Sequence, residues 1–148
     1  MALGMLTSLV FGFVQLLRED RTPPRWSLVG QTKQGFAISI DVDEHGKLRT
    51  FDTRVTGRCA SGEIRSVRWH PGGNGAPARF NGRGPRFEAE EVKQTSFADG
   101  SSSHLTLKLA GRVNRRKASG TLRYVARYQL TDGSTTRCES PVVAWSAD

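Results

Sequence analysis

Apolar and polar residues alternate along most of this chain, from Trp26 to its last residues. Between residues 36 and 42, apolar side chains occupy every second position, and Ser39 and Asp41 lie between them. This alternation is typical of a β-strand with one buried face. Comparable stretches follow at 48–59, 64–70, 86–95, 105–109, 122–130 and 135–145. No helical pattern appears after residue 25.

Short turn-forming segments separate these stretches. The clearest are 43–47, 114–117 and the Asp132-Gly133 pair, and Asp-Gly is a strong hairpin signal. Leu48 is out of phase with the residues that follow it, which predicts a β-bulge. Pro141 implies an edge position or a bulge in the last strand. The pattern predicts an all-β, antiparallel sandwich or barrel of about eight or nine strands.

The first 25 residues differ from the rest. Residues 1–17 are mostly apolar and are interpreted as an atypical or truncated export or anchor segment, although a basic start and a small-residue cleavage site are missing. A helix docked on the domain, or an oligomer contact, is the alternative. Residues 18–25 contain Pro23 and Pro24 and are expected to be a linker. The β domain is expected to occupy 26–148.

The chain has two cysteines, Cys59 and Cys138, and each lies late in an alternating stretch. Two cysteines cannot form a tetrahedral zinc site alone, but they can form one disulfide. We expect this bond, with Cα atoms about 5–6 Å apart, and therefore a location outside the cytosol, secreted or tethered to a membrane. Two buried free thiols in a cytosolic protein are the alternative.

The formal net charge is +8, and only five of the 22 basic residues are lysines. A basic domain is attracted to phosphates, anionic polysaccharides and anionic lipid surfaces. The simpler interpretation is that the arginines reflect genome composition and solubility.

The register of one hairpin predicts where part of this positive charge lies. If Val113 pairs with Ala118 across the turn 114–117, the core residues 105, 107 and 109 face 126, 124 and 122. The same register places Lys108 opposite Arg123 on the outer side, where like charges are unfavourable unless an anion, or a carboxylate such as Glu90 or Glu91, lies between them. The candidate polyanion-binding residues are Lys108, Arg112, Arg115, Arg116, Lys117, Arg123 and Arg127.

Other residues do not form a recognisable catalytic or metal-binding pattern. The three histidines, His45, His70 and His104, lie near turns and have no second ligand at metal-binding spacing. Glu88 and Glu90 share a strand face but are expected to be surface partners of basic residues rather than a catalytic pair. Neither a G-x-S-x-G motif nor a phosphate-binding loop is present. We expect no enzymatic activity, no cofactor and no metal.

The tryptophans have two interpretations. Trp26, Trp69 and Trp145 are numerous enough to form a platform on which sugars stack. Two of them lie in alternating stretches, which favours a place in the core.

Several short motifs occur in a suggestive order. They are Gly30-x-Thr32-x-x-Gly35, Cys59-Ala-Ser-Gly62, GRGPRF at 82–87, Gly111-Arg-Val, ASGTL at 118–122, Cys138 and VAWSA at 143–147. In this order they resemble a group of uncharacterised bacterial exported β domains with one cysteine pair, over most of residues 28–147. Residues 139–141 depart from the pattern, because a glycine turn is expected there. The resemblance implies export but no activity.

These observations together predict a non-catalytic β domain that is exported or associated with the cell envelope and acts as an interaction module. The alternative is a polyanion-binding domain, for a cell-wall polymer or nucleic acid, that uses the basic hairpin face. Residues 1–17 add a possible membrane association.

Overall fold

The computed structural model describes residues 26–71, 80–82 and 84–148, and this part of the chain is all-β. The strands are β1 (Trp26–Thr32), β2 (Ala37–Val42), β3 (Leu48–Cys59), β4 (Ile64–Trp69), β5 (Arg86–Ser96), β6 (Ser102–Val113), β7 (Ala118–Gln129), β8 (Thr135–Glu139) and β9 (Val143–Ala147). This confirms the predicted fold class. The predicted export segment and linker lie outside the described residues. Within the described ranges, no helix is long and apolar enough to cross a membrane.

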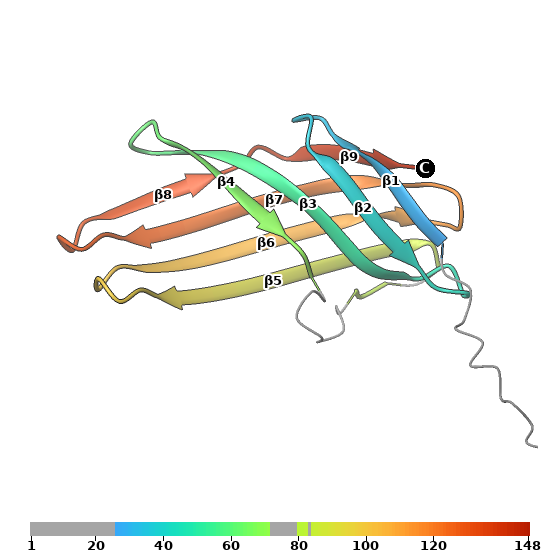
Figure 1. The fold of residues 1–148 in the computed structure, drawn as a ribbon, viewed down its shortest axis with the longest axis horizontal. Coiled ribbons are helices and arrows are strands. Elements are labelled where there is room, and N and C mark those ends of the chain that lie inside the picture. The colour runs from blue at the N-terminus through green and yellow to red at the C-terminus, as the bar shows by residue number, and fades with distance from the viewer. Residues whose placement is uncertain (1–25, 72–79, 83) are drawn as a thin grey trace, which may run out of the picture.

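The strands form one antiparallel sheet in the order β4-β3-β2-β1-β9-β7-β6-β5, and β8 joins β3 to β7. The sheet curls so that β1 to β4 cross over β5 to β8 (Figure 1). Two contacts close this barrel-like arrangement. β1 pairs with β9 along Gly30–Thr32, and β8 pairs with the end of β3 at Arg58 and Cys59. Among the described residues, the edge strands β4 and β5 have one strand partner each.

The expected strand 135–145 is two strands instead of one. β8 ends at Glu139 and β9 begins at Val143. β8 pairs with the C-terminal half of β7. β9 pairs with the N-terminal half of β7 and also with β1. Pro141 lies in the gap, where its missing N–H removes no ladder hydrogen bond. The interruption lets one segment close the sheet in two places.

The predicted bulge is confirmed where β2 meets β3. The register shifts between Asp41, which faces Thr50, and Val42, which faces Leu48. Arg49 is therefore the extra residue on β3. The shift returns Leu48 to the core side, where it is buried.

Aromatic side chains form the centre of the core. Phe51 contacts Trp69 and Trp145 edge to face, with ring centroids 5.9 and 5.1 Å apart. Trp69 and Trp145 expose 0% and 3% of their surface, which confirms the core interpretation of these two residues. Trp26 is partly buried against the same core.

Trp145 also depends on two glycines that face each other across strands. Gly111 pairs with Gly120, and Gly120 pairs with Trp145. A Cβ atom on Gly111 would lie 2.9 Å from the Trp145 indole and 2.9 Å from the Phe87 ring. The indole therefore lies across backbone that carries no side chains.

Cys59 and Cys138 form a disulfide, and the described residues contain no free cysteine. The two residues are direct partners of β3 and β8. Their Cα atoms are 3.7 Å apart, closer than the expected 5–6 Å. The neighbouring pair carries the hydrogen bond, from the Ala60 N–H to the Arg137 carbonyl. The cysteines thus occupy a non-hydrogen-bonded site, where opposite Cα atoms approach to about 4.5 Å.

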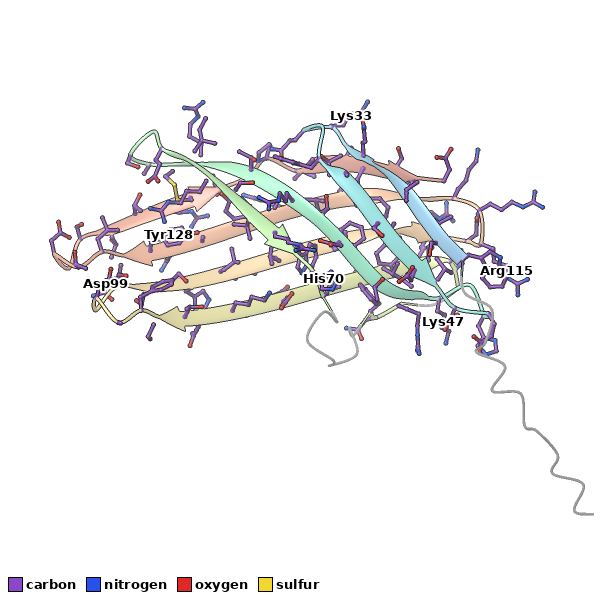
Figure 2. The ribbon with its side chains drawn as sticks, viewed as in Figure 1. Lys33, Lys47, His70, Asp99, Arg115 and Tyr128 are labelled. Atoms are coloured by element: carbon purple, nitrogen blue, oxygen red, sulfur yellow. A yellow bond between two sulfur atoms is a disulfide. The ribbon has the colours of Figure 1, made fainter. Side chains whose placement is uncertain are left out.

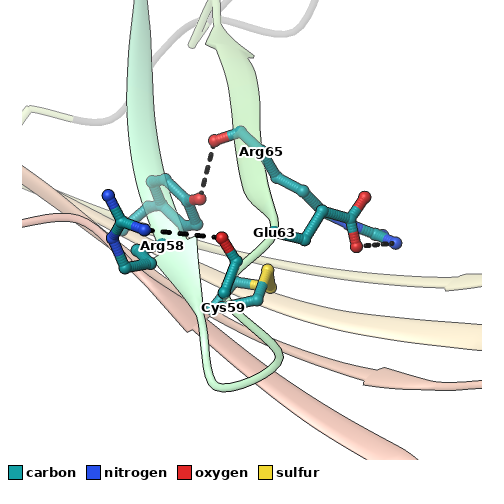
Figure 3. The surroundings of a disulfide bond; sticks show 7 residues. Arg58, Cys59, Glu63 and Arg65 are labelled. Atoms are coloured by element: carbon teal, nitrogen blue, oxygen red, sulfur yellow. Dashed lines mark hydrogen bonds and ion pairs between the residues drawn. A yellow bond between two sulfur atoms is a disulfide. The ribbon is translucent and has the colours of Figure 1, made fainter.

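Arg58 and Arg65 lie near the Cys59 end of the disulfide (Figure 3), and the buried Tyr124 contacts Arg65. The Tyr124 hydroxyl donates to the Arg65 carbonyl at 2.9 Å. A Cβ atom on Gly57 would lie 2.5 Å from that hydroxyl, so the tyrosine needs a glycine there. Burial, together with the nearby Tyr128, raises the pKa of Tyr124. This end of the barrel is held by a covalent bond and a buried hydrogen bond.

A carboxylate ties β3 to β4 on the outside of the barrel. Asp52 accepts two hydrogen bonds from Arg68, at 3.0 and 2.6 Å. These bonds lower the pKa of Asp52, although partial burial opposes them. Because the pKa is lower in the folded state, the stabilisation is fully present above the unfolded value of about 3.9 and is lost as the pH falls through the folded pKa.

We expect Asp52→Asn to lower the free energy of unfolding at neutral pH by about 0.5–1 kcal/mol, discounted for the exposure of Arg68. Urea titrations at a series of pH values should show this difference shrinking once Asp52 of the wild type becomes protonated. Arg68→Gln should remove the same increment, and adding Asp52→Asn to it should cost little more. A difference that stays constant at acidic pH would contradict the assignment.

Candidate functional site

The outer face of the barrel across β5 to β8 carries most of the predicted basic residues. The predicted register of the β6–β7 hairpin is confirmed, with Val113 opposite Ala118 and Lys108 opposite Arg123. The core residues Leu107 and Tyr124 also face each other, so their neighbours point outward. We call the side chains of β5 to β8 that point away from the core the outer face.

Carboxylates neutralise the middle of the outer face. Glu90 on β5 lies 3.3 Å from Lys108. Glu139 on β8 lies 3.1 Å from Arg137 and 3.3 Å from Arg123. Arg137, and to a smaller extent Arg123, hold the pKa of Glu139 below its ordinary value. The like charges of Lys108 and Arg123 are therefore compensated from the two flanking strands.

At one end of the outer face, the turn between β6 and β7 presents basic residues. Arg115 is engaged within the domain, because it donates to the Glu44 carbonyl at 2.6 Å and lies 4.6 Å from the centre of the Trp26 ring. Figure 2 shows Arg115 at the same end of the molecule as Lys47. The other basic residues here are exposed, and we call them the turn cluster: Arg86, Arg112, Arg116 and Lys117.

At the other end, one row of polar side chains crosses four strands. Gln94, His104, Arg127 and Arg137 are successive cross-strand partners on β5, β6, β7 and β8, and we call them the distal row. The Gln94 amide and the His104 ring nitrogen Nδ1 lie 2.9 Å apart. Within the described ranges, neither Arg127 nor Arg112 has an ion-pair partner.

The residues of the distal row line a hollow of about 600 Å³. Side chains with hydroxyl and amide groups surround it: Ser96, Ser102, Gln129 and Thr135. Arg137 already pairs with Glu139 at 3.1 Å, whereas the Arg127 guanidinium lies among neutral donors and suits an anionic group such as a carboxylate, sulfate or phosphate. The hollow is therefore the best-formed candidate for an anion subsite on the outer face.

Two residues of these clusters were missed from the sequence. Arg137 faces Arg127 because β7 and β8 form a hairpin around Asp132-Gly133. Extending the register through that turn would have found it. Arg86 faces Arg112, and extending the register through the Asp99-Gly100 turn between β5 and β6 would have found it as well.

The remaining candidates are distributed elsewhere. Glu88 exchanges backbone hydrogen bonds with Asn81 at the free edge of β5. His45 lies beside Glu44, and His70 lies 3.5 Å from Asp52. In the described part of the chain, no three His, Cys, Asp or Glu side chains come close enough to hold a metal ion.

No protein-family model, curated protein or solved structure matches this chain.

Proposed function

We propose that this protein is a non-catalytic binding module that acts outside the cytosol and holds an extended polyanion along its outer face. The observation that carries the proposal is the pairing pattern of the basic residues. Carboxylates compensate the middle of the face, whereas Arg127 at one end and Arg112 at the other have no carboxylate partner in the described part of the chain. The positive potential therefore concentrates at the distal row and the turn cluster.

The spacing of the two clusters sets the kind of ligand. Arg127 of the distal row lies on β7, and Arg112 of the turn cluster lies opposite Ser119, eight residues before Arg127 on that strand. Eight residues of antiparallel strand correspond to about 27 Å. A single small anion cannot reach both clusters, whereas a linear polymer with repeated charges can contact both and release counterions from each.

The proposed location rests on the disulfide. Disulfides persist in oxidising compartments and are rare in the cytosol, and the Cys59–Cys138 bond is compatible with such a compartment. The resemblance to exported β domains agrees with this location. Thiol labelling of denatured, unreduced protein taken directly from cells should find no free thiol.

Binding of single-stranded DNA, used as a convenient polyanion, tests the ligand class. We expect affinity to fall steeply with salt, and to increase with oligonucleotide length until both clusters are spanned. Replacing Arg112 and Arg127 by serine should flatten the slope of log K against log salt by about 1.4, because two phosphate contacts are lost at about 0.7 each. Fluorescence anisotropy at several salt concentrations measures this slope, and heparin oligosaccharides of matched length compare nucleic acid with polysaccharide.

The matched control is Arg49→Ser with Arg54→Ser. It removes the same charge from the exposed surface of β3, away from the outer face. If both double variants change the salt slope equally, binding follows net charge alone and the outer face is not the site. Absence of binding at low salt would reject the proposal.

A further inference from the structure

β5 is an edge strand with an open row of backbone groups. It pairs with β6 on one side, and Figure 1 shows it at the margin of the sheet. On the other side, the Glu88 N–H and carbonyl bond to Asn81 at 2.6 and 2.8 Å. Even-numbered residues of β5 therefore direct their backbone groups to the free edge. In the described part of the chain, no strand pairs with Glu90, Val92 or Gln94 on that side.

The side chains of this edge alternate in a self-complementary order. Glu91 and Lys93 point toward the core side and lie 3.1 Å apart, and Glu91 also accepts a hydrogen bond from the Trp69 indole at 2.7 Å. Val92 points to the outer face and is 53% exposed. Charged residues normally discourage edge pairing. Here, a negative and a positive charge flank an exposed apolar residue symmetrically.

An antiparallel pairing of two β5 strands about a twofold axis at Val92 matches every one of these groups. Val92 then faces Val92 of the second copy, and Glu90 faces Gln94. These pairs exchange about six backbone hydrogen bonds. On the core side, Glu91 of each copy faces Lys93 of the other, which forms two attractive cross-strand pairs. The Asn81 bridge at Glu88 limits the paired segment to residues 89–95.

Neighbouring registers are less favourable. An axis at Lys93 places the two lysines opposite each other, and an axis at Glu91 does the same for the two glutamates. An axis at Glu90 would place Val92 opposite Glu88 of the second copy. The backbone of Glu88 already bonds to Asn81, so it is not open for this pairing. The order of charges thus selects one register.

We propose that two copies of this chain associate through their β5 edges, antiparallel, with the twofold axis at Val92. A closed, isologous contact of this kind satisfies the β5 edges of both copies. It would also join the outer faces of the two copies into one continuous sheet. The proposal does not depend on the ligand of the outer face.

Cysteine cross-linking of the full chain tests the register. Val92→Cys places the new thiols opposite each other, within disulfide reach, so we expect a covalent dimer under mild oxidation. Gln94→Cys is the matched control, because its thiols would be about 14 Å apart in the paired edges and should not react. Equal cross-linking of the two variants, or none of Val92→Cys, would overturn the register.

Sedimentation equilibrium tests the association itself. We expect the dissociation constant to rise about tenfold in Lys93→Glu, because two attractive pairs become repulsive. Lys47→Glu makes the same charge change on an exposed turn and should leave the constant unchanged. A protein that stays monomeric at all concentrations, or a Lys93→Glu variant that associates like the wild type, would overturn the proposal.

Discussion

Replacing Cys59 and Cys138 by serine is expected to lower the free energy of unfolding by about 4–5 kcal/mol. The bond closes a loop with a sequence separation of 79, and loss of that constraint releases the corresponding chain entropy in the unfolded state. The effect is also local, because β8 pairs with β3 at only Arg58 and Cys59. Without the bond, this side of the barrel depends on few hydrogen bonds.

Denaturant titration measures the loss, and hydrogen exchange locates it. Amides of β8 and of the end of β3 should exchange faster in the serine variant, whereas those of β6 should change in proportion to global stability only. Reduced wild-type protein is the control, since it should match the serine variant closely. A loss below about 1 kcal/mol would mean that the unfolded chain is already compact around this loop.

Trp69→Ala is expected to cost about 3–5 kcal/mol, the usual range for removing a fully buried large aromatic side chain. Trp69 is 0% exposed and packs against Phe51. Its indole N–H is also a direct link from β4 to β5, through Glu91. Truncation leaves a cavity in the core and removes the hydrogen bond that joins these two edge strands.

Two further variants separate packing from hydrogen bonding in this result. Trp69→Phe keeps most of the apolar volume but removes the donor, so its cost should be clearly smaller than that of alanine. Trp26→Ala should also cost less, because Trp26 is only partly buried at the end of β1. Thermal unfolding of the three variants should show the largest loss of stability for Trp69→Ala. Equal costs at positions 26 and 69 would contradict the central role of Trp69.

The features that the sequence predicted well are local ones. The β6–β7 register follows from two alternating strands and a four-residue turn, so the pattern fixes which residues face each other, from Val113 with Ala118 onward. The bulge at Arg49 is visible as a break in the same alternation, because Leu48 is out of phase with the residues that follow it. The cysteine pair needed only an even count and matching positions.

The features that were missed depend on segments far apart in sequence. Alternation does not reveal that β9 returns to β1, or that Arg115 lies on Trp26. The neutralisation of Lys108 was left open because the register was not extended to β5 through the Asp99-Gly100 turn. The carboxylate partners of the outer face, Glu90 and Glu139, belong to strands on either side of the hairpin. Charge patterns along one strand are therefore insufficient to define a charged surface.

The pairing of β1 with β9 has a kinetic consequence. Gly30 lies opposite Ala147, and the backbone of Val29 exchanges hydrogen bonds with Asp148. β5, β6 and β7 can assemble from neighbouring hairpins, but closure must wait until β9 has emerged from the ribosome. Contacts of such high sequence separation slow folding. During synthesis, β1 therefore has β2 as a partner but lacks its second partner until β9 arrives, so the barrel cannot close at this seam before then.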